Sequence, residues 1–178
     1  MVLQEVNIPS KITMIGRRAF QLSGIKSIVL PDVKGIILEG SVFDQCHNLE
    51  SCTVPDGYDI TAASGLFSSC LALQEVVIGE GITTRPSTCF NRCTALRKVI
   101  LPSTVSSIKE NILFGATAME NFMIKAVNPP SISNNDLGYN FSNTCKIYVP
   151  DTSVNAYKES SWWTKYSSRI YPMSSLSD

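Results

Sequence analysis

The chain has 178 residues, a length that suits one domain with a sizeable core. Its 15 basic and 15 acidic residues give a formal net charge of zero and form no basic run, so nucleic acid and membrane surfaces are not expected as partners. No apolar stretch is long enough to span a bilayer as a helix, so membrane insertion is not expected either.

The chain opens directly on a strand-like segment. Residues 3–8 carry apolar side chains at Leu3, Val6 and Ile8 and are followed by Pro9, and no signal peptide precedes them. Either the chain is cytosolic, or it is a piece of a longer chain whose export signal and first repeats lie upstream. We favour the second interpretation, because an uncapped first coil would expose apolar surface.

A phenylalanine then recurs every 23 or 24 residues, at Phe20, Phe43, Phe67, Phe90 and Phe114. Three residues after each one stands a small side chain, which is Ser23, Cys46, Cys70, Cys93 or Thr117. A hexad with three apolar positions follows, and Pro31, Pro55 and Pro102 close three of these hexads. A fixed period of this length predicts a solenoid, in which each coil buries its apolar face against its neighbours.

The sequence of each repeat predicts three structural segments. In residues 96–101, Leu96, Val99 and Leu101 point inward, and Pro102 ends the strand because it lacks a main-chain donor. A second extended stretch follows, with apolar residues three apart. The segment around each Phe is expected to form one turn of helix or 3₁₀ helix that places the Phe and the small residue on the inner side.

Five of the six cysteines fit this pattern as buried side chains. Cys46, Cys70 and Cys93 share one repeat position, whereas Cys52 and Cys89 stand at apolar positions. Because three cysteines in one column cannot all pair, we expect free thiols, with a bridge between neighbouring coils as the alternative.

The joint recurrence of proline, Phe and Cys over residues 3–125 resembles the BspA-type leucine-rich repeats of bacterial surface proteins, most fully in residues 6–20. Residues 32–40, Ala62-Ala63 and Thr117 depart from the pattern. The resemblance implies an α/β repeat solenoid, a right-handed leucine-rich-repeat superhelix with one parallel sheet wall, short helical turns and a C-terminal strand-helix cap. Residues 1–127 would form about five and a half coils.

The period breaks at residues 128–130, and residues 136–144 form a polar loop. We interpret residues 128–178 as a capping segment packed on the last coil, not an independent domain. It contains a strand at 146–149, N-caps at 151–153, and a helix followed by Trp162 and Trp163. The spacing to Tyr157 and Tyr166 predicts that Trp163 is buried and Trp162 partly exposed.

The residue pattern favours no catalytic or metal site. His47 is the only histidine, and its neighbour Cys46 belongs to the buried column, so their side chains should point apart. The three column sulfurs would lie along the solenoid axis and not around a tetrahedral zinc ion. The carboxylates fall on outward positions that form no cleft. We therefore expect no enzyme activity, no cofactor and no metal.

The outward positions of the strand wall are a candidate interaction stripe. They read Asn7, Val29, Thr53, Val77, Ile100 and Met123, of which four are apolar. The alternatives are that β-branched residues simply favour strands, or that another domain covers the stripe. Outward charges flank it and alternate between coils, at Lys26, Glu50, Glu75, Arg97, Lys98 and Glu120, and they are expected to fix the register.

The family resemblance implies an adhesion-type, non-catalytic domain that is secreted or on the cell surface and binds another protein of the host or of a bacterial surface. A spacer without a ligand is a second hypothesis, and a carbohydrate-binding module using Trp162 and Trp163 is a third. The sequence leaves the ligand and the oligomeric state open.

Overall fold

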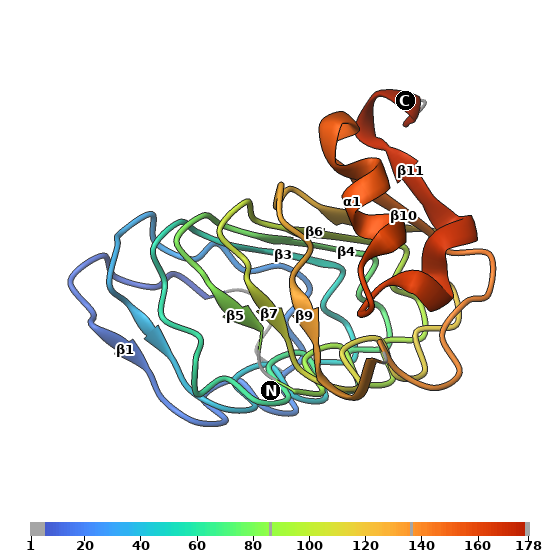
Figure 1. The fold of residues 1–178 in the computed structure, drawn as a ribbon. Helices are drawn as coiled ribbons and strands as arrows, with labels where there is room; N and C mark the ends of the chain where they lie inside the picture. The colour runs from blue at the N-terminus through green and yellow to red at the C-terminus, as the bar shows by residue number, and fades with distance from the viewer. Residues whose placement is uncertain (1–5, 86, 136, 177–178) are drawn as a thin grey trace.

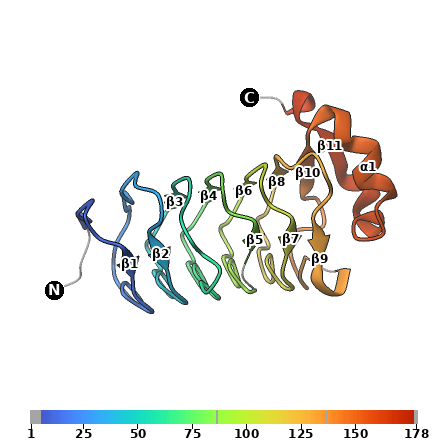
Figure 2. The same cartoon turned by 60° about the vertical axis from the view of Figure 1, so that its left-hand side comes forward.

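The computed structural model describes residues 6–85, 87–135 and 137–176 as a stack of coils (Figure 1). The coils follow one another in chain order, and the C-terminal helix lies at the far end of the stack (Figure 2). We number the coils from the N-terminus, so that residues 25–48 form the second and residues 49–72 the third. The predicted repeat solenoid with a parallel sheet wall is confirmed.

One wall of the solenoid is a six-stranded parallel sheet with the order β11-β10-β8-β6-β4-β3. Its strands are β3 (Ser51–Val54), β4 (Glu75–Ile78), β6 (Lys98–Leu101), β8 (Asn121–Ile124), β10 (Lys146–Val149) and β11 (Ile170–Pro172). In β3, β4, β6 and β8 every second residue is buried, as expected for strands with one face on a core.

A second wall consists of two-residue strands. The predicted second extended stretch forms such strands at residues 14–15 and 107–108, and residues 37–38 form one as well although residues 32–40 depart from the pattern. β1 (Met14–Ile15) pairs with β2 (Ile37–Leu38), and β5 (Thr84–Arg85), β7 (Ser107–Ile108) and β9 (Ser131–Ile132) form a separate parallel sheet. The 3₁₀ helix η1 (Ser133–Asn135) follows β9. Buried residues such as Ile15, Leu38 and Ile108 join this wall to the common core.

The sheet wall is interrupted where the sequence predicted continuity. The hexad of residues 25–30 forms no strand; only Val29 makes a bridge, to Asn7, and β3 is an edge of the main sheet. Gly35 follows Leu30 by five positions, whereas Gly57 follows Val54 by three. The Gly35 N–H nevertheless bonds the Gly57 carbonyl at 2.9 Å. The second coil therefore carries two more residues over this stretch, directly after the segment that does not pair with β3.

The third wall differs in detail from the expected turn of helix. Tight turns close with i to i+3 hydrogen bonds, as from Ala19 N–H to the Gly16 carbonyl and from Gln21 N–H to the Arg18 carbonyl. Residues within these consecutive turns have φ of about 60°, for example Arg18 and Leu22, and this left-handed conformation stops a helix from propagating. Inside the turns, the rings of Phe20, Phe43, Phe67 and Phe90 stack at centroid distances of 5.3–5.9 Å.

The predicted Phe and Cys columns are wrong by one residue in the fifth coil. Each column Phe donates its N–H to the residue that precedes the next column member, so Phe67 bonds the Cys89 carbonyl, and Phe90 bonds that of Ile112. This register places Leu113 in the column and leaves Phe114 outside it, half-buried against Tyr139. Likewise Ala116 is buried where Thr117 was expected.

The C-terminal segment continues the sheet and covers its end (Figure 1). After β10 come η2 (Asp151–Ser153), α1 (Val154–Glu159), η3 (Thr164–Arg169), β11 and η4 (Met173–Ser175). The strand β11 was not predicted. The predicted N-cap is wrong, because Ser153 makes no side-chain cap bond and Asp151 accepts a hydrogen bond from Ser174 N–H instead, at 3.0 Å.

The two tryptophans differ in exposure as the spacing predicted. Trp163 is fully buried, and its Nε1 donates to the Pro130 carbonyl at 2.8 Å. Tyr157 is also buried and donates its hydroxyl to the Ala126 carbonyl at 2.8 Å. Trp162 is 42% exposed.

Candidate functional site

The candidate stripe forms one row across the strand wall. Thr53 lies beside Val77, Val77 beside Ile100, and Ile100 beside Met123 in the register of the sheet. Val77, Ile100 and Met123 are half-buried and Thr53 is exposed. Val29, at 83% exposure, is the most exposed large apolar residue of the row and lies across the interruption from Thr53. We call these five residues the outer row.

The outer row ends at two tyrosines that the sequence analysis missed. Met123 pairs with Tyr148, and Tyr148 pairs with Tyr171. The two rings lie 6.1 Å apart, Tyr148 is buried although it stands at an outward position, and the Lys146 ammonium lies 5.7 Å from the centre of the Tyr171 ring. The predicted strand at 146–149 could have identified Tyr148. Tyr171 gave no such signal because β11 was not predicted.

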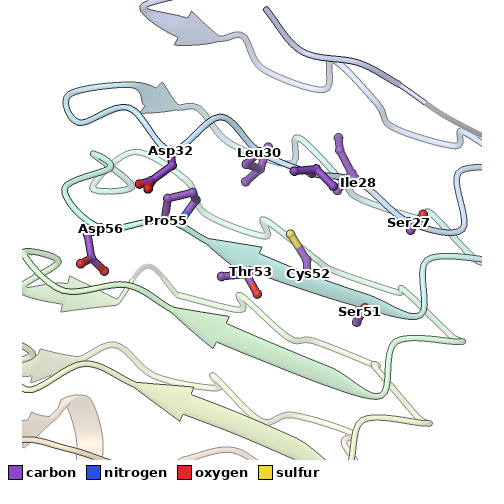
Figure 3. A pocket seen from close by; sticks show the side chains of 10 residues that line it. Ser27, Ile28, Leu30, Asp32, Ser51, Cys52, Thr53, Pro55 and Asp56 are labelled. Carbon is purple, nitrogen blue, oxygen red and sulfur yellow. The ribbon is translucent and has the colours of Figure 1, made fainter. Parts of the chain in front are cut away.

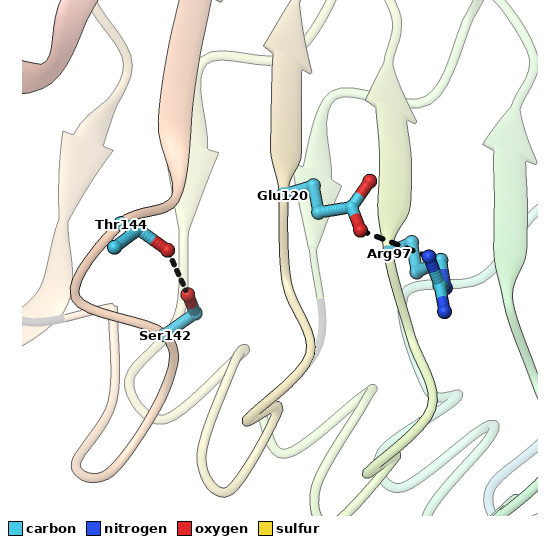
Figure 4. A network of polar contacts seen from close by, with 4 residues as sticks. All are labelled: Arg97, Glu120, Ser142 and Thr144. Atoms are coloured by element: carbon cyan, nitrogen blue, oxygen red, sulfur yellow. Dashed lines mark hydrogen bonds and ion pairs between the residues drawn. The ribbon is translucent and has the colours of Figure 1, made fainter.

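Charged residues flank the outer row and pair between neighbouring strands. Lys98 Nζ lies 3.2 Å from a Glu75 carboxylate oxygen, and Arg97 lies 3.0 Å from Glu120 (Figure 4). Within the described residues, Lys26 and Glu50 belong to no ion pair. Exposed pairs of this kind contribute little to stability, so their main effect is on register and on the polarity of the surface beside the row.

A second polar contact lies nearer the C-terminus. The hydroxyls of Ser142 and Thr144 are 3.0 Å apart (Figure 4), in the loop before β10. The neighbouring Arg169 donates to the Ser142 carbonyl at 3.1 Å and lies over the Phe141 ring. These contacts tie the loop to η3 and do not form a binding centre.

None of the six cysteines forms a disulfide, and all six are buried. Burial raises the pKa of Cys52 to about 12 and also raises the pKa values of Cys70 and Cys93. Thiols with raised pKa values are poor nucleophiles and poor metal ligands at neutral pH. In the part of the chain that the structure describes, no three His, Cys, Asp or Glu side chains are grouped so that they could hold a metal ion.

The other sequence candidates are not brought together into a site. His47 is exposed whereas Cys46 is buried, so the two side chains separate as expected. Trp163 is buried in the C-terminal segment, so the tryptophan pair does not present two rings to a sugar. The outer row is thus the most extended apolar feature among the described surface residues that the sequence had singled out.

A model of the BspA-type leucine-rich repeat region, in six copies, matches residues 1–87 and 35–148. The fold is similar to that of a leucine-rich repeat protein from Bacteroides ovatus, with 20% identity and a TM-score of 0.62 over 96% of this chain and 48% of that one. It is also similar to a leucine-rich cell surface protein from Faecalibacterium prausnitzii, with 24% identity and a TM-score of 0.58 over 96% of this chain and 39% of that one.

The chain therefore spans about half or less of the length of these solved structures. None of the curated proteins compared matches the sequence. Among the described residues there is no helix with the length and apolar character needed to cross a membrane.

Proposed function

The chain belongs to the BspA-type leucine-rich repeat family, and we propose that it is a non-catalytic, adhesion-type domain that binds another protein at a bacterial cell surface. The observation that carries the proposal is the outer row. It places the apolar side chains of Val77, Ile100 and Met123, from three successive strands of the sheet, in register on the outer face of the wall. A regular, exposed apolar surface is typical of a contact region.

The display of this domain on a cell surface is supported by family membership and by the Faecalibacterium neighbour, which is a cell surface protein. The absence of catalytic activity is supported by the separation of His47 from Cys46 and by the raised pKa of the column thiols. Within this proposal the partner is a protein, since the row offers apolar contacts and no basic patch.

The proposal is tested with a double variant, Val77→Lys with Ile100→Lys. Both side chains point away from the core, so the free energy of unfolding should change by less than about 0.5 kcal/mol per site. Capture of partner proteins from host extracellular matrix should be lost, because apolar anchors at the centre of an interface contribute most of its energy.

A matched control adds the same charge elsewhere. Thr83→Lys with Ser106→Lys places two lysines at exposed positions of two neighbouring coils on the second wall, and capture should persist. If the double variant of the row still captures its partner, the row is not the binding surface. If the unmodified domain captures nothing, a spacer explains the chain better, and a glycan array then tests the carbohydrate alternative.

A further inference from the structure

A groove crosses the strand wall where the main sheet is interrupted (Figure 3). It lies between the second coil and β3 and has a volume of about 600 Å³. Its sides are two extended segments in matching positions, Ser27 to Asp32 in the second coil and Ser51 to Asp56 in the third. The groove also lies within the outer row, because Val29 and Thr53 stand on its opposite sides.

Main-chain groups face each other across the groove without pairing. Glu50 N–H bonds the Lys26 carbonyl at 3.0 Å at one end, and Gly35 N–H bonds the Gly57 carbonyl at 2.9 Å at the other. Between these two bonds, the described residues form no main-chain hydrogen bond across the gap. The Val54 carbonyl accepts a hydrogen bond from Gly79 N–H, on the side of β3 away from the groove. Because the main-chain N–H and carbonyl groups of successive residues in a strand point to opposite sides, those of Thr53 face the groove.

The floor of the groove is apolar and reaches the core. Ile28 is 8% exposed and Cys52 4%, whereas their equivalents Val76 and Val99 are fully buried. Solvent therefore touches the core at this place and not at the equivalent positions of the paired strands. A ligand that fills the groove would bury these side chains along with its own apolar side chains.

One end of the groove is acidic. Asp32 and Asp56 lie at the same end, opposite Ser27 and Ser51 (Figure 3), and among the described residues no basic side chain lines the groove. Asp56 accepts a hydrogen bond from Glu80 N–H at 2.8 Å. Within the described residues, Asp32 makes neither a hydrogen bond nor an ion pair. This arrangement is complementary to a ligand with a Lys or Arg at one end.

We propose that this groove binds an extended peptide segment of the partner protein as an added strand against β3, with a basic side chain next to Asp32. The inference rests on the proposed function and names the chemistry of the partner. Strand addition gives main-chain hydrogen bonds to a free sheet edge and leaves alternate side chains to confer specificity. Four extended residues, about 13 Å long, match the length of β3.

Hydrogen exchange tests the open edge first. The Thr53 amide should exchange faster than those of Val77 and Ile100, which occupy the same row in paired strands. Equal protection of the three amides in the free protein would mean that the gap is closed in solution, and would overturn the proposal.

The binding test uses a labelled hexapeptide, TVTVKR, followed by NMR and by fluorescence polarisation. The peptide should shift and protect the Thr53 amide. A peptide ending in two glutamates, or one N-methylated at alternate residues, should bind about tenfold more weakly, because the first reverses the complementary charge and the second removes ladder donors. Asp32→Lys should reverse the preference between the basic and the acidic peptide.

Thr53→Pro removes the donor that faces the groove, and Thr53→Ala is its matched control. Proline is tolerated at an edge position whose N–H is unpaired, so both variants should fold, and only Thr53→Pro should lose peptide binding. If Thr53→Pro fails to fold, the N-methylated peptide tests the same hydrogen bonds on the unmodified protein.

Binding that is indifferent to N-methylation and to Asp32→Lys would overturn the proposal, as would no shift at Thr53 with any of these peptides. Self-association that Thr53→Pro abolishes would assign the groove to a second copy of the chain and also count against it. The peptide experiment and the capture experiment test different proposals. If the peptide binds but the domain captures no protein, the groove proposal stands and the proposed function is contradicted. If the domain captures a protein but no peptide binds, the proposed function stands and the groove proposal is contradicted.

Discussion

The thiol of Cys70 donates a hydrogen bond to the main-chain carbonyl of Phe43 in the preceding coil, with a Sγ to O distance of 3.0 Å. Cys93 makes the same bond to Phe67 at 3.0 Å, and Cys46 makes it to Phe20 at 2.9 Å. Each bond links one coil to the coil before it. The repeat position therefore favours a small side chain that is also a donor, which accounts for cysteine in three successive coils.

We expect Cys70→Ser to be mild and Cys70→Ala to cost about 1 kcal/mol more, because serine retains a donor and alanine does not. The comparison is made by urea unfolding of both variants. The Phe43 carbonyl still accepts from Cys46 N–H in either variant, so a larger loss is not expected. Equal stability of the two variants would show that size alone matters at this position.

The register of the fifth coil predicts unequal costs for two neighbouring residues. Leu113→Ala should destabilise the domain by about 2–5 kcal/mol, because Leu113 is fully buried in the column. Phe114→Ala should cost less, about 1–2 kcal/mol, because Phe114 is only half-buried and lies against Tyr139. Chemical denaturation measures both free energies of unfolding. A greater loss for Phe114→Ala would show that Phe114, and not Leu113, occupies the column, as the sequence period predicts.

The tryptophans should differ in fluorescence and in stability. With Trp162→Phe, the remaining Trp163 should emit at shorter wavelength and resist acrylamide quenching, since it is buried between Tyr157 and Tyr166. Trp163→Phe should cost about 1–3 kcal/mol, because the Pro130 carbonyl loses its donor. Trp162→Phe should change the free energy of unfolding by less than about 0.5 kcal/mol. Stronger quenching of Trp163 than of Trp162 would contradict this placement.

The buried thiols predict a loss of stability in alkali. Burial raises the pKa values of Cys52 and Cys145 to about 12 from the ordinary 9.0, so the thiols stay protonated in the folded protein and ionise on unfolding. Their contribution is complete below pH 9 and is lost as the pH rises toward 12.

Urea unfolding under reducing conditions at about pH 7 and about pH 10 measures this loss, which should be about 1.4 kcal/mol for each such thiol at the higher pH. Cys52→Val is the control, because valine stands at the equivalent positions 76 and 99 and carries no proton to lose. In Cys52→Val, the loss of unfolding free energy between about pH 7 and about pH 10 should be smaller by about 1.4 kcal/mol, the contribution of one thiol. An unchanged loss would show that ionisation of Cys52 does not contribute to it.

The repeat period was sufficient to predict the solenoid, because burial recurs wherever the same positions recur. It could not fix the column in the fifth coil, where Leu113 and Phe114 are both apolar and only main-chain hydrogen bonds distinguish them. The interruption beside β3 was also missed. Residues 32–40 depart from the sequence pattern, but the loss of strand pairing depends on how the extra residues are accommodated in three dimensions.

The candidate site, too, could be predicted from the sequence only in part. Alternation along a strand was enough to place Val77, Ile100 and Met123 on the outer face. Tyr171 could not be assigned to the row, because a two- or three-residue strand in a polar tail has no periodicity from which to recognise it. The groove depends on the main-chain groups of Thr53 having no neighbouring strand to pair with. The residues around Thr53 do not indicate this, because they have the same strand pattern as the paired strands.

The interruption also affects how the coils can move. The second and third coils remain joined on two walls, for example by Leu38 N–H to the Asp59 carbonyl at 2.8 Å and by Phe43 N–H to the Leu66 carbonyl at 2.9 Å. On the strand wall, the two coils share no main-chain hydrogen bond among the described residues between the Glu50–Lys26 bond and the Gly35–Gly57 bond. Because the two coils are joined on the other two walls, a change in the bend of the solenoid at this junction would widen or narrow the strand wall. A partner that holds the two coils at one angle would fix the curvature of the whole N-terminal part of the domain.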